Sequence, residues 1–134
     1  MNRSAFLTVT AVIEAATGVG LLVLPAVVFG LLLGESAAAP DTVLVGRIAG
    51  AALLALGFAC WPGRRDGAEP VRPGLLTGLL VYNVAVTALL VDAGAGPGRV
   101  GVLLWPAVGV HTALAGWGLA NLLFKSQTSH PRGG

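Results

Sequence analysis

Four long stretches of apolar residues make up most of this 134-residue chain, and each is about as long as a membrane-spanning helix. A helix needs roughly 20 mostly apolar residues to cross the hydrocarbon core of a bilayer. None of the stretches alternates polar and apolar residues as a membrane barrel strand does. We therefore expect an all-α, polytopic membrane protein whose single domain is a four-transmembrane-helix bundle. The predicted spans are residues 5–33, 42–61, 73–91 and 99–124, followed by a polar cytoplasmic tail at 125–134.

The composition supports a lipid environment. Hydrophobic residues make up 55% of the chain and charged residues only 10%, whereas soluble domains carry about 25% charged residues. The formal net charge is +2 and the basic residues are dispersed, which argues against a nucleic-acid partner. Cys60 is the only cysteine, so an intramolecular disulfide, a CxxC redox motif and a multi-cysteine zinc site are excluded.

Prolines, glycines and charged residues predict where the helices are interrupted. Pro25 lies inside the first stretch, so we expect a span to about Leu24 and then a kink or a short interfacial turn reaching Gly34. The run from Asp92 to Gly98 predicts a complete break after the third span. Residues 36–39 resemble a signal-peptide cleavage site, but the preceding apolar run is about twice as long as a signal core of about 7–15 residues. We therefore expect the first helix to be retained.

The basic residues predict the orientation in the membrane. In a four-span protein, most of them lie on one side, Arg99 lies on the other, and Arg47 lies inside the second span. The residues on the first side are Arg3, Arg64, Arg65, Arg72, Lys125 and Arg132. Since cytoplasmic loops carry an excess of Lys and Arg, we expect both termini in the cytoplasm and a multi-pass protein of the bacterial inner membrane.

Glu14 is the only charged residue inside the first apolar stretch, and a charged group at membrane depth marks a functional site by default. At 1.5 Å rise per residue, Glu14 lies about 13 Å from the inner edge of the bilayer core, and Tyr82 and Asn83 lie about 13–15 Å from it. His111 lies about 16 Å from the outer edge of a ~30 Å core, and Arg47 about 7 Å from the same edge. We therefore predict a ligand or proton site formed by Glu14, Arg47, Tyr82, Asn83 and His111.

Each of these polar residues also has a structural interpretation. Asn83 can join helices through a hydrogen bond worth about 1 kcal/mol, and His111 can be a hydrogen-bonded core residue. Arg47 lies close enough to the outer headgroups to extend its side chain to them. For Glu14, three states stay open: it carries a proton, it pairs with Arg47, or it lines a cavity.

Pairs of small residues spaced four apart predict close helix packing. Gly46 and Gly50 form such a pair in the second span, and Gly74 and Gly78 form one in the third. We interpret both as packing positions, at which a neighbouring helix comes close.

The second span opens with Val45-Gly46-Arg47-Ile48-Ala49-Gly50-Ala51-Ala52-Leu53-Leu54-Ala55-Leu56-Gly57. With its Arg-x-x-Gly start, this segment resembles small bacterial DoxX-like membrane proteins, and the resemblance in hydropathy covers most of the chain. It implies a small membrane protein and, as for some members, association with redox-linked membrane complexes. The chain also resembles small multidrug resistance transporters in its four spans and the membrane glutamate in the first. That resemblance implies that Glu14 exchanges protons for a cationic drug.

Three functions from different classes fit these features. The one we favour is a non-enzymatic structural or accessory bundle, in which the polar cluster around Glu14 specifies helix packing. The second is a proton-coupled small-molecule transporter acting as a homo-oligomer, with Glu14 as the proton carrier. The third is a haem- or quinone-binding redox protein with His111 as the contact. No nucleophile–base set or phosphate loop supports an enzyme. We expect no cofactor and no metal site, and as partners the lipid bilayer and a second copy or a membrane complex.

Overall fold

The computed structural model describes residues 2–34, 39–62, 73–98 and 100–126. The regular structure in these residues is all helical, without strands, as the sequence predicts. The helices are α1 (Arg3–Val23), α2 (Pro25–Leu33), α3 (Pro40–Cys60), α4 (Pro73–Ala95) and α5 (Leu104–Ser126). Within the described ranges, α1, α3 and the Gly74–Ala95 part of α4 are long and apolar enough to cross a membrane. The fourth predicted span corresponds to α5, which is 23 residues long but is not among those three helices.

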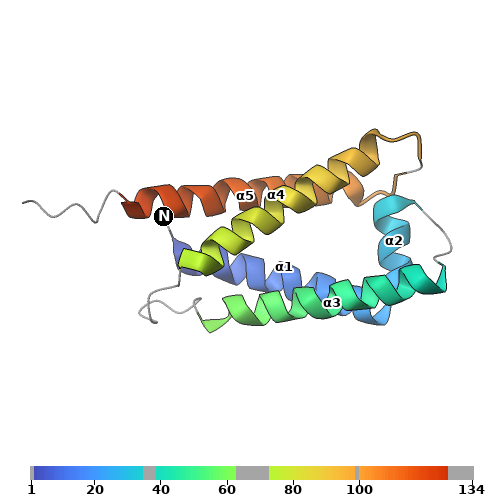
Figure 1. Cartoon of the computed structure of the whole chain (residues 1–134), viewed down its shortest axis with the longest axis horizontal. Helices are drawn as coiled ribbons and strands as arrows, with labels where there is room; N and C mark the ends of the chain where they lie inside the picture. The colour runs from blue at the N-terminus through green and yellow to red at the C-terminus, as the bar shows by residue number, and fades with distance from the viewer. Residues whose placement is uncertain (1, 35–38, 63–72, 99, 127–134) are drawn as a thin grey trace, which may run out of the picture.

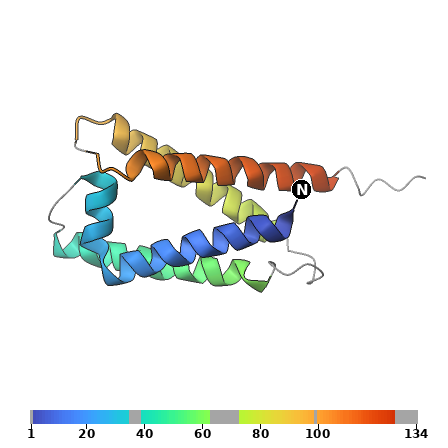
Figure 2. The ribbon, with the colours of Figure 1, turned by 180° about the vertical axis from the view of Figure 1, so that it is seen from behind.

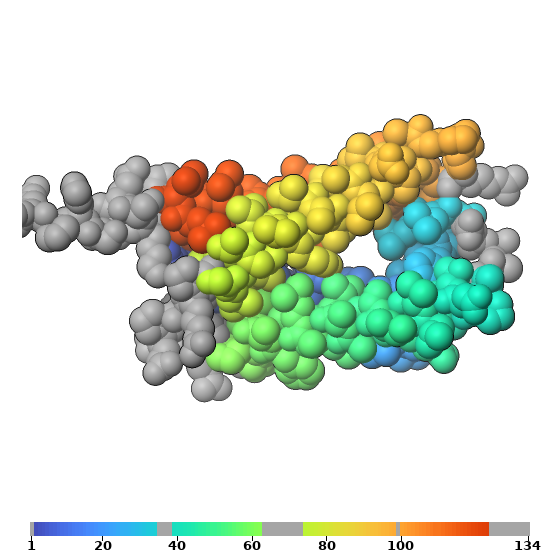
Figure 3. Space-filling view, viewed as in Figure 1, coloured from blue at the N-terminus to red at the C-terminus, as the bar shows by residue number. Residues whose placement is uncertain are grey.

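The long helices form two antiparallel pairs. α1 packs along α3, and α4 packs along α5, while far fewer contacts join one pair to the other. Both ribbon views show the pairs close together where α1 begins and spread apart toward the other end, where α2 stands between them (Figures 1 and 2). In the space-filling view, the surfaces of α3 and α4 separate toward α2, leaving a hollow (Figure 3). The bundle is therefore narrow at one end and wide at the other.

The break at Pro25 produces this shape. A proline disfavours the helical conformation in the residue before it, and Leu24 has φ −132° and ψ 53°, outside the α region. Pro25 then occupies the first turn of α2, where its missing N–H costs no hydrogen bond. Helix α2 ends at Gly34, whose φ of 73° is the left-handed conformation that glycine adopts readily. The predicted kink is thus a complete change of helix direction (Figure 1).

Glycines hold α2 against both helix pairs. On the α3 side, a Cβ at Gly46 would lie 2.8 Å from the Phe29 ring, so α2 and α3 meet without room for a larger residue. On the α5 side, the backbone N–H groups of Gly101 and Leu103 donate hydrogen bonds of 3.0 and 2.8 Å to the carbonyls of Leu32 and Leu31. A Cβ at Gly101 would overlap the Leu31 carbonyl. Helix α2 is therefore fixed as a spacer between the pairs.

Of the two predicted glycine pairs, only one lies in a helix contact. A Cβ at Gly50 would lie 2.7 Å from the Gly18 carbonyl oxygen, so the backbones of α1 and α3 touch there. A Cβ at Gly74 or Gly78, in contrast, would meet nothing within 4 Å in the described part of the chain. Here the interpretation as a packing position within the chain is wrong, because that face of α4 is exposed.

The helix ends differ from the expected boundaries around the third loop. Helix α4 continues through Asp92 to Ala95 instead of breaking after Val91. Its last turn is supported by tertiary packing, since a Cβ at Gly94 would lie 2.9 Å from the Leu104 side chain. Helix α5 begins only at Leu104, because the preceding amides are bonded to α2. The basic residues Arg64, Arg65, Arg72, Arg99 and Arg132, and the tail from residue 127, lie outside the described residues.

A hydrophobic core fills the narrow end. Its buried members come from all four long helices: Phe6, Leu7, Ala11, Cys60, Leu76, Leu79 and Leu114. The Phe6 and Trp117 rings meet edge to face with their centroids 5.6 Å apart. Next to them, the Arg3 guanidinium donates a 3.1 Å hydrogen bond to the backbone carbonyl of Asn121. These contacts hold α1 against α5 at this end.

Candidate functional site

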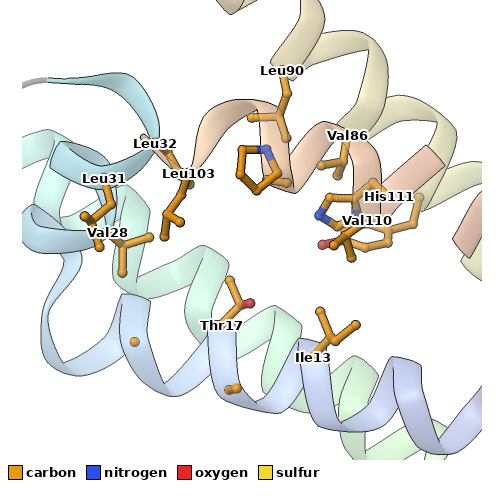
Figure 4. Close-up of a pocket in the computed structure, with 15 residues that line it drawn as sticks. Ile13, Thr17, Val28, Leu31, Leu32, Val86, Leu90, Leu103, Val110 and His111 are labelled. Carbon is orange, nitrogen blue, oxygen red and sulfur yellow. The ribbon is translucent and has the colours of Figure 1, made fainter. Parts of the chain in front are cut away.

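A cavity of about 470 Å³ occupies the wide end of the bundle. It lies between α1, α2, α4 and α5 and is partly open. Most of its lining is aliphatic or small: Ile13, Ala16, Gly20, Val28, Leu31, Leu32, Val86, Leu90, Leu103, Pro106, Ala107 and Val110. Its polar lining residues are Thr17, Tyr82 and His111. Figure 4 shows the α2 residues Val28, Leu31 and Leu32 at one end of the cavity and His111 at the other, with Thr17 between them.

Glu14 does not line the cavity but contacts Tyr82, which does. Its side chain is only 1% exposed, and its Oε2 accepts a 3.1 Å hydrogen bond from the Tyr82 hydroxyl. The other oxygen, Oε1, is buried without a hydrogen-bond partner in the described structure, and so is the hydroxyl of Thr10 one turn earlier. Burying an unpaired polar atom costs about 1–3 kcal/mol. The hydrogen bonds of the Glu14 carboxyl therefore stabilise the fold little, because only one of its two oxygens is paired within the described ranges.

His111 and Asn83 form the second half of the polar cluster. His111 Nδ1 lies 2.9 Å from Asn83 Oδ1, and Asn83 Nδ2 donates a 2.8 Å hydrogen bond to the Leu79 carbonyl one turn earlier in α4. Asn83 itself is completely buried. The rings of His111 and Tyr82 meet edge to face with their centroids 5.8 Å apart, so the two halves of the cluster are in contact.

The structure thus brings together Glu14, Tyr82, Asn83 and His111, which the depth estimate places near one level. Arg47 is separate from them. Its side chain is exposed, and no ion pair joins it to Glu14 among the described residues, since the contact of the Glu14 carboxyl is with Tyr82. The reason is the rotation of α3 about its axis. Gly46 faces α2 and Gly50 faces α1, so Arg47 lies on the outward side of the helix. Pairing of Glu14 with Arg47 is therefore wrong for this structure.

Sequence reasoning missed most of the cavity wall. Thr17 could have been found from the sequence, because it is a polar residue one turn from Glu14. Its position in the cavity wall, however, depends on how far the helix pairs lie apart. Asn121 is another polar residue of α5, only 2% exposed, and its amide bonds the Trp117 carbonyl. The α2 residues of the cavity wall could not be recognised from the sequence, because Val and Leu are equally common on helix faces that contact lipid.

The chemistry that this site supports is binding and proton exchange. In the described part of the chain, no group of three or more His, Cys, Asp or Glu side chains could hold a metal ion. Comparisons with protein-family models, with curated proteins and with solved structures found no match. The interpretation of the site therefore rests on its geometry: an apolar cavity with a carboxyl–phenol pair and an amide–imidazole pair at one end.

Proposed function

We propose that this chain is a non-enzymatic, four-span protein of the inner membrane that binds a small lipophilic molecule in the cavity between its helix pairs. The observation that carries the proposal is the cavity itself. Ligand sites are typically clefts of about 300–1,000 Å³, mostly apolar and with a few polar groups at fixed positions. A volume of about 470 Å³ with three polar residues, Thr17, Tyr82 and His111, in an otherwise apolar lining matches that description.

The outward faces of the helices support a bilayer as the environment of the protein. Large apolar side chains are exposed on them, for example Val45, Phe58 and Leu89 at 62%, 72% and 69%, and extended apolar surfaces of this kind are rare on soluble monomers. We take α5 as the fourth span because it runs beside α4 and directs His111 and Asn121 into the bundle, where both are hydrogen-bonded. Membership of the DoxX-like group and the orientation of the termini stay predictions.

The test uses two fluorescent probes of nearly equal size, 2-naphthol and 2-methoxynaphthalene, and the protein in lipid nanodiscs. Equilibrium dialysis with empty nanodiscs as the reference measures how much probe partitions into lipid alone, and this amount is subtracted. We expect saturable binding with about one probe per chain, because a cavity of this size accommodates one molecule of naphthol. The Ala107→Phe variant, which places a ring in the cavity, should weaken binding by about tenfold or more, since overfilling costs about 1–3 kcal/mol.

The matched control is Ala113→Phe, because Ala113 lies on the same helix but is exposed on its outer face. It should bind both probes like the unmodified protein. Equal partition of both probes into loaded and empty nanodiscs would overturn the proposal. Unchanged binding by Ala107→Phe would also overturn it, because the bound probe would then lie elsewhere.

A purely structural role is the second candidate, and one observation favours it. The hydrogen bonds from Tyr82 to Glu14 and between His111 and Asn83 connect α4 to α1 and to α5, so both could serve to fix helix positions. This role predicts that substitutions in the cluster change stability while the probes find no saturable site.

A further inference from the structure

The Asn83 amide has a defined orientation between α4 and His111. Asn83 Nδ2 lies 2.8 Å from the Leu79 carbonyl oxygen. A carbonyl oxygen only accepts hydrogen bonds, so the NH₂ group of the amide must face it. The amide oxygen Oδ1 is then the atom that lies 2.9 Å from His111 Nδ1. Because Asn83 is completely buried, water does not compete for either position.

This arrangement determines which ring nitrogen of His111 carries the proton. The amide oxygen is an acceptor, so His111 Nδ1 must be the donor. A neutral imidazole carries one N–H, and its other nitrogen is an acceptor. His111 in its neutral form therefore carries its proton on Nδ1 and leaves the lone pair of Nε2 free.

The free nitrogen belongs to the cavity wall. Nε2 has no hydrogen-bond partner among the described residues, it is not among the buried unpartnered atoms, and His111 lines the cavity (Figure 4). The neighbouring Tyr82 hydroxyl already donates to Glu14, so its proton is not free for a ligand. The remaining polar group, the Thr17 hydroxyl, can donate or accept and does not discriminate.

We infer that the cavity selects a lipophilic molecule carrying a hydroxyl group, a phenol or an alcohol, whose O–H donates to His111 Nε2. The inference rests on the proposed function and adds the class of ligand. Its apolar body would lie toward Val28, Leu31 and Leu32, at the end away from His111 (Figure 4). A ligand with only carbonyl or ether oxygens would leave Nε2 unpaired and compete poorly, since leaving a desolvated polar atom without a partner is unfavourable.

The naphthalene pair tests this directly, because the two probes differ in the O–H donor. We expect 2-naphthol to bind about tenfold more tightly than 2-methoxynaphthalene after correction for lipid partition, the range of one buried hydrogen bond. In His111→Phe, which keeps a ring but has no nitrogen, the two affinities should become equal, and that of the methoxy probe should change little. Asn83→Leu frees Nδ1 and should reduce the preference without changing His111.

A measurement without any probe tests the proton position. In protein labelled with ¹⁵N-histidine and carrying His130→Gln, so that His111 is the only histidine, the nitrogen spectrum should show a protonated Nδ1 and an unprotonated Nε2. The opposite tautomer, or an imidazolium at neutral pH, would overturn the inference even if both probes bind.

The outcomes separate the two proposals. Saturable binding of both probes with equal affinity overturns the hydroxyl preference and leaves the binding function standing, as for a cavity that takes any apolar chain such as a lipid tail. The absence of saturable binding by either probe overturns the binding function, while the nitrogen spectrum still reports on the Nδ1–Asn83 hydrogen bond.

Discussion

The two ends of the bundle contain similar residues but are packed differently. At the narrow end, Phe6, Leu7 and Leu79 have no exposed surface and belong to one continuous core. At the wide end, residues of the same kinds, such as Leu90 and Leu103, line a cavity of about 470 Å³. The same helices α1, α4 and α5 contribute to both ends.

The difference is made by α2. At the wide end this short helix stands between the helix pairs (Figure 1), held by Gly46 on one side and by the amides of Gly101 and Leu103 on the other. At the narrow end nothing separates the pairs, and the Phe6 and Trp117 rings meet. Glu14 and Tyr82 lie at the boundary between the two regions. A cavity in a small bundle can thus be produced by one short helix that holds two helix pairs apart.

The largest expected effect distinguishes the core from the cavity wall. Leu79→Ala should lower the free energy of unfolding by about 2–5 kcal/mol, because it leaves a void in a filled core. Leu90→Ala should cost about 1 kcal/mol or less, because its side chain already adjoins empty space. Unfolding with SDS in mixed micelles measures both, and equal costs would contradict the distinction between the two ends.

The next effect tests the spacer. Gly101→Val should displace α2, because a side chain there overlaps the Leu31 carbonyl, and should cost about 1–3 kcal/mol. The same variant should weaken naphthol binding about tenfold. Gly98→Val is the control, since a Cβ at Gly98 meets nothing within 4 Å. If Gly101→Val binds the probe normally, α2 does not shape the cavity.

A smaller effect is expected at the boundary. Tyr82→Phe removes the hydroxyl that donates to Glu14, and Glu14→Leu removes the oxygen that accepts this hydrogen bond. A double-mutant cycle of these two substitutions should give a coupling of about 1 kcal/mol in the SDS unfolding measurement. A coupling indistinguishable from zero would mean that the hydrogen bond does not join the helix pairs.

The smallest effect is a gain. Ala107→Leu adds apolar volume to the cavity and should stabilise the protein by about 0.5 kcal/mol, as cavity-filling substitutions commonly do. Ala113→Leu adds the same volume on the exposed face of α5 and should leave stability unchanged. A loss of stability in Ala107→Leu alone would indicate that the cavity has less free space than its volume suggests.

Much of the site could be predicted because depth follows from residue number. A helix rises by about 1.5 Å per residue, so Glu14, Tyr82, Asn83 and His111 could be assigned to one level once the spans were recognised. Their pairing could not be predicted, since it depends on the rotation of each helix about its axis. Arg47 illustrates this, because its level allows a contact with Glu14 while its direction does not.

By itself, the sequence determined the helical class, the presence of three helices long and apolar enough to cross a membrane, the break at Pro25 and the candidate level of the polar residues. These properties follow from local chemistry: hydropathy, the missing N–H of proline and helical rise. Only the tertiary structure decided that α2 holds the pairs apart, that Glu14 bonds Tyr82 rather than Arg47, and that His111 is paired with Asn83. Those features depend on contacts between residues far apart in the chain, which no local pattern encodes.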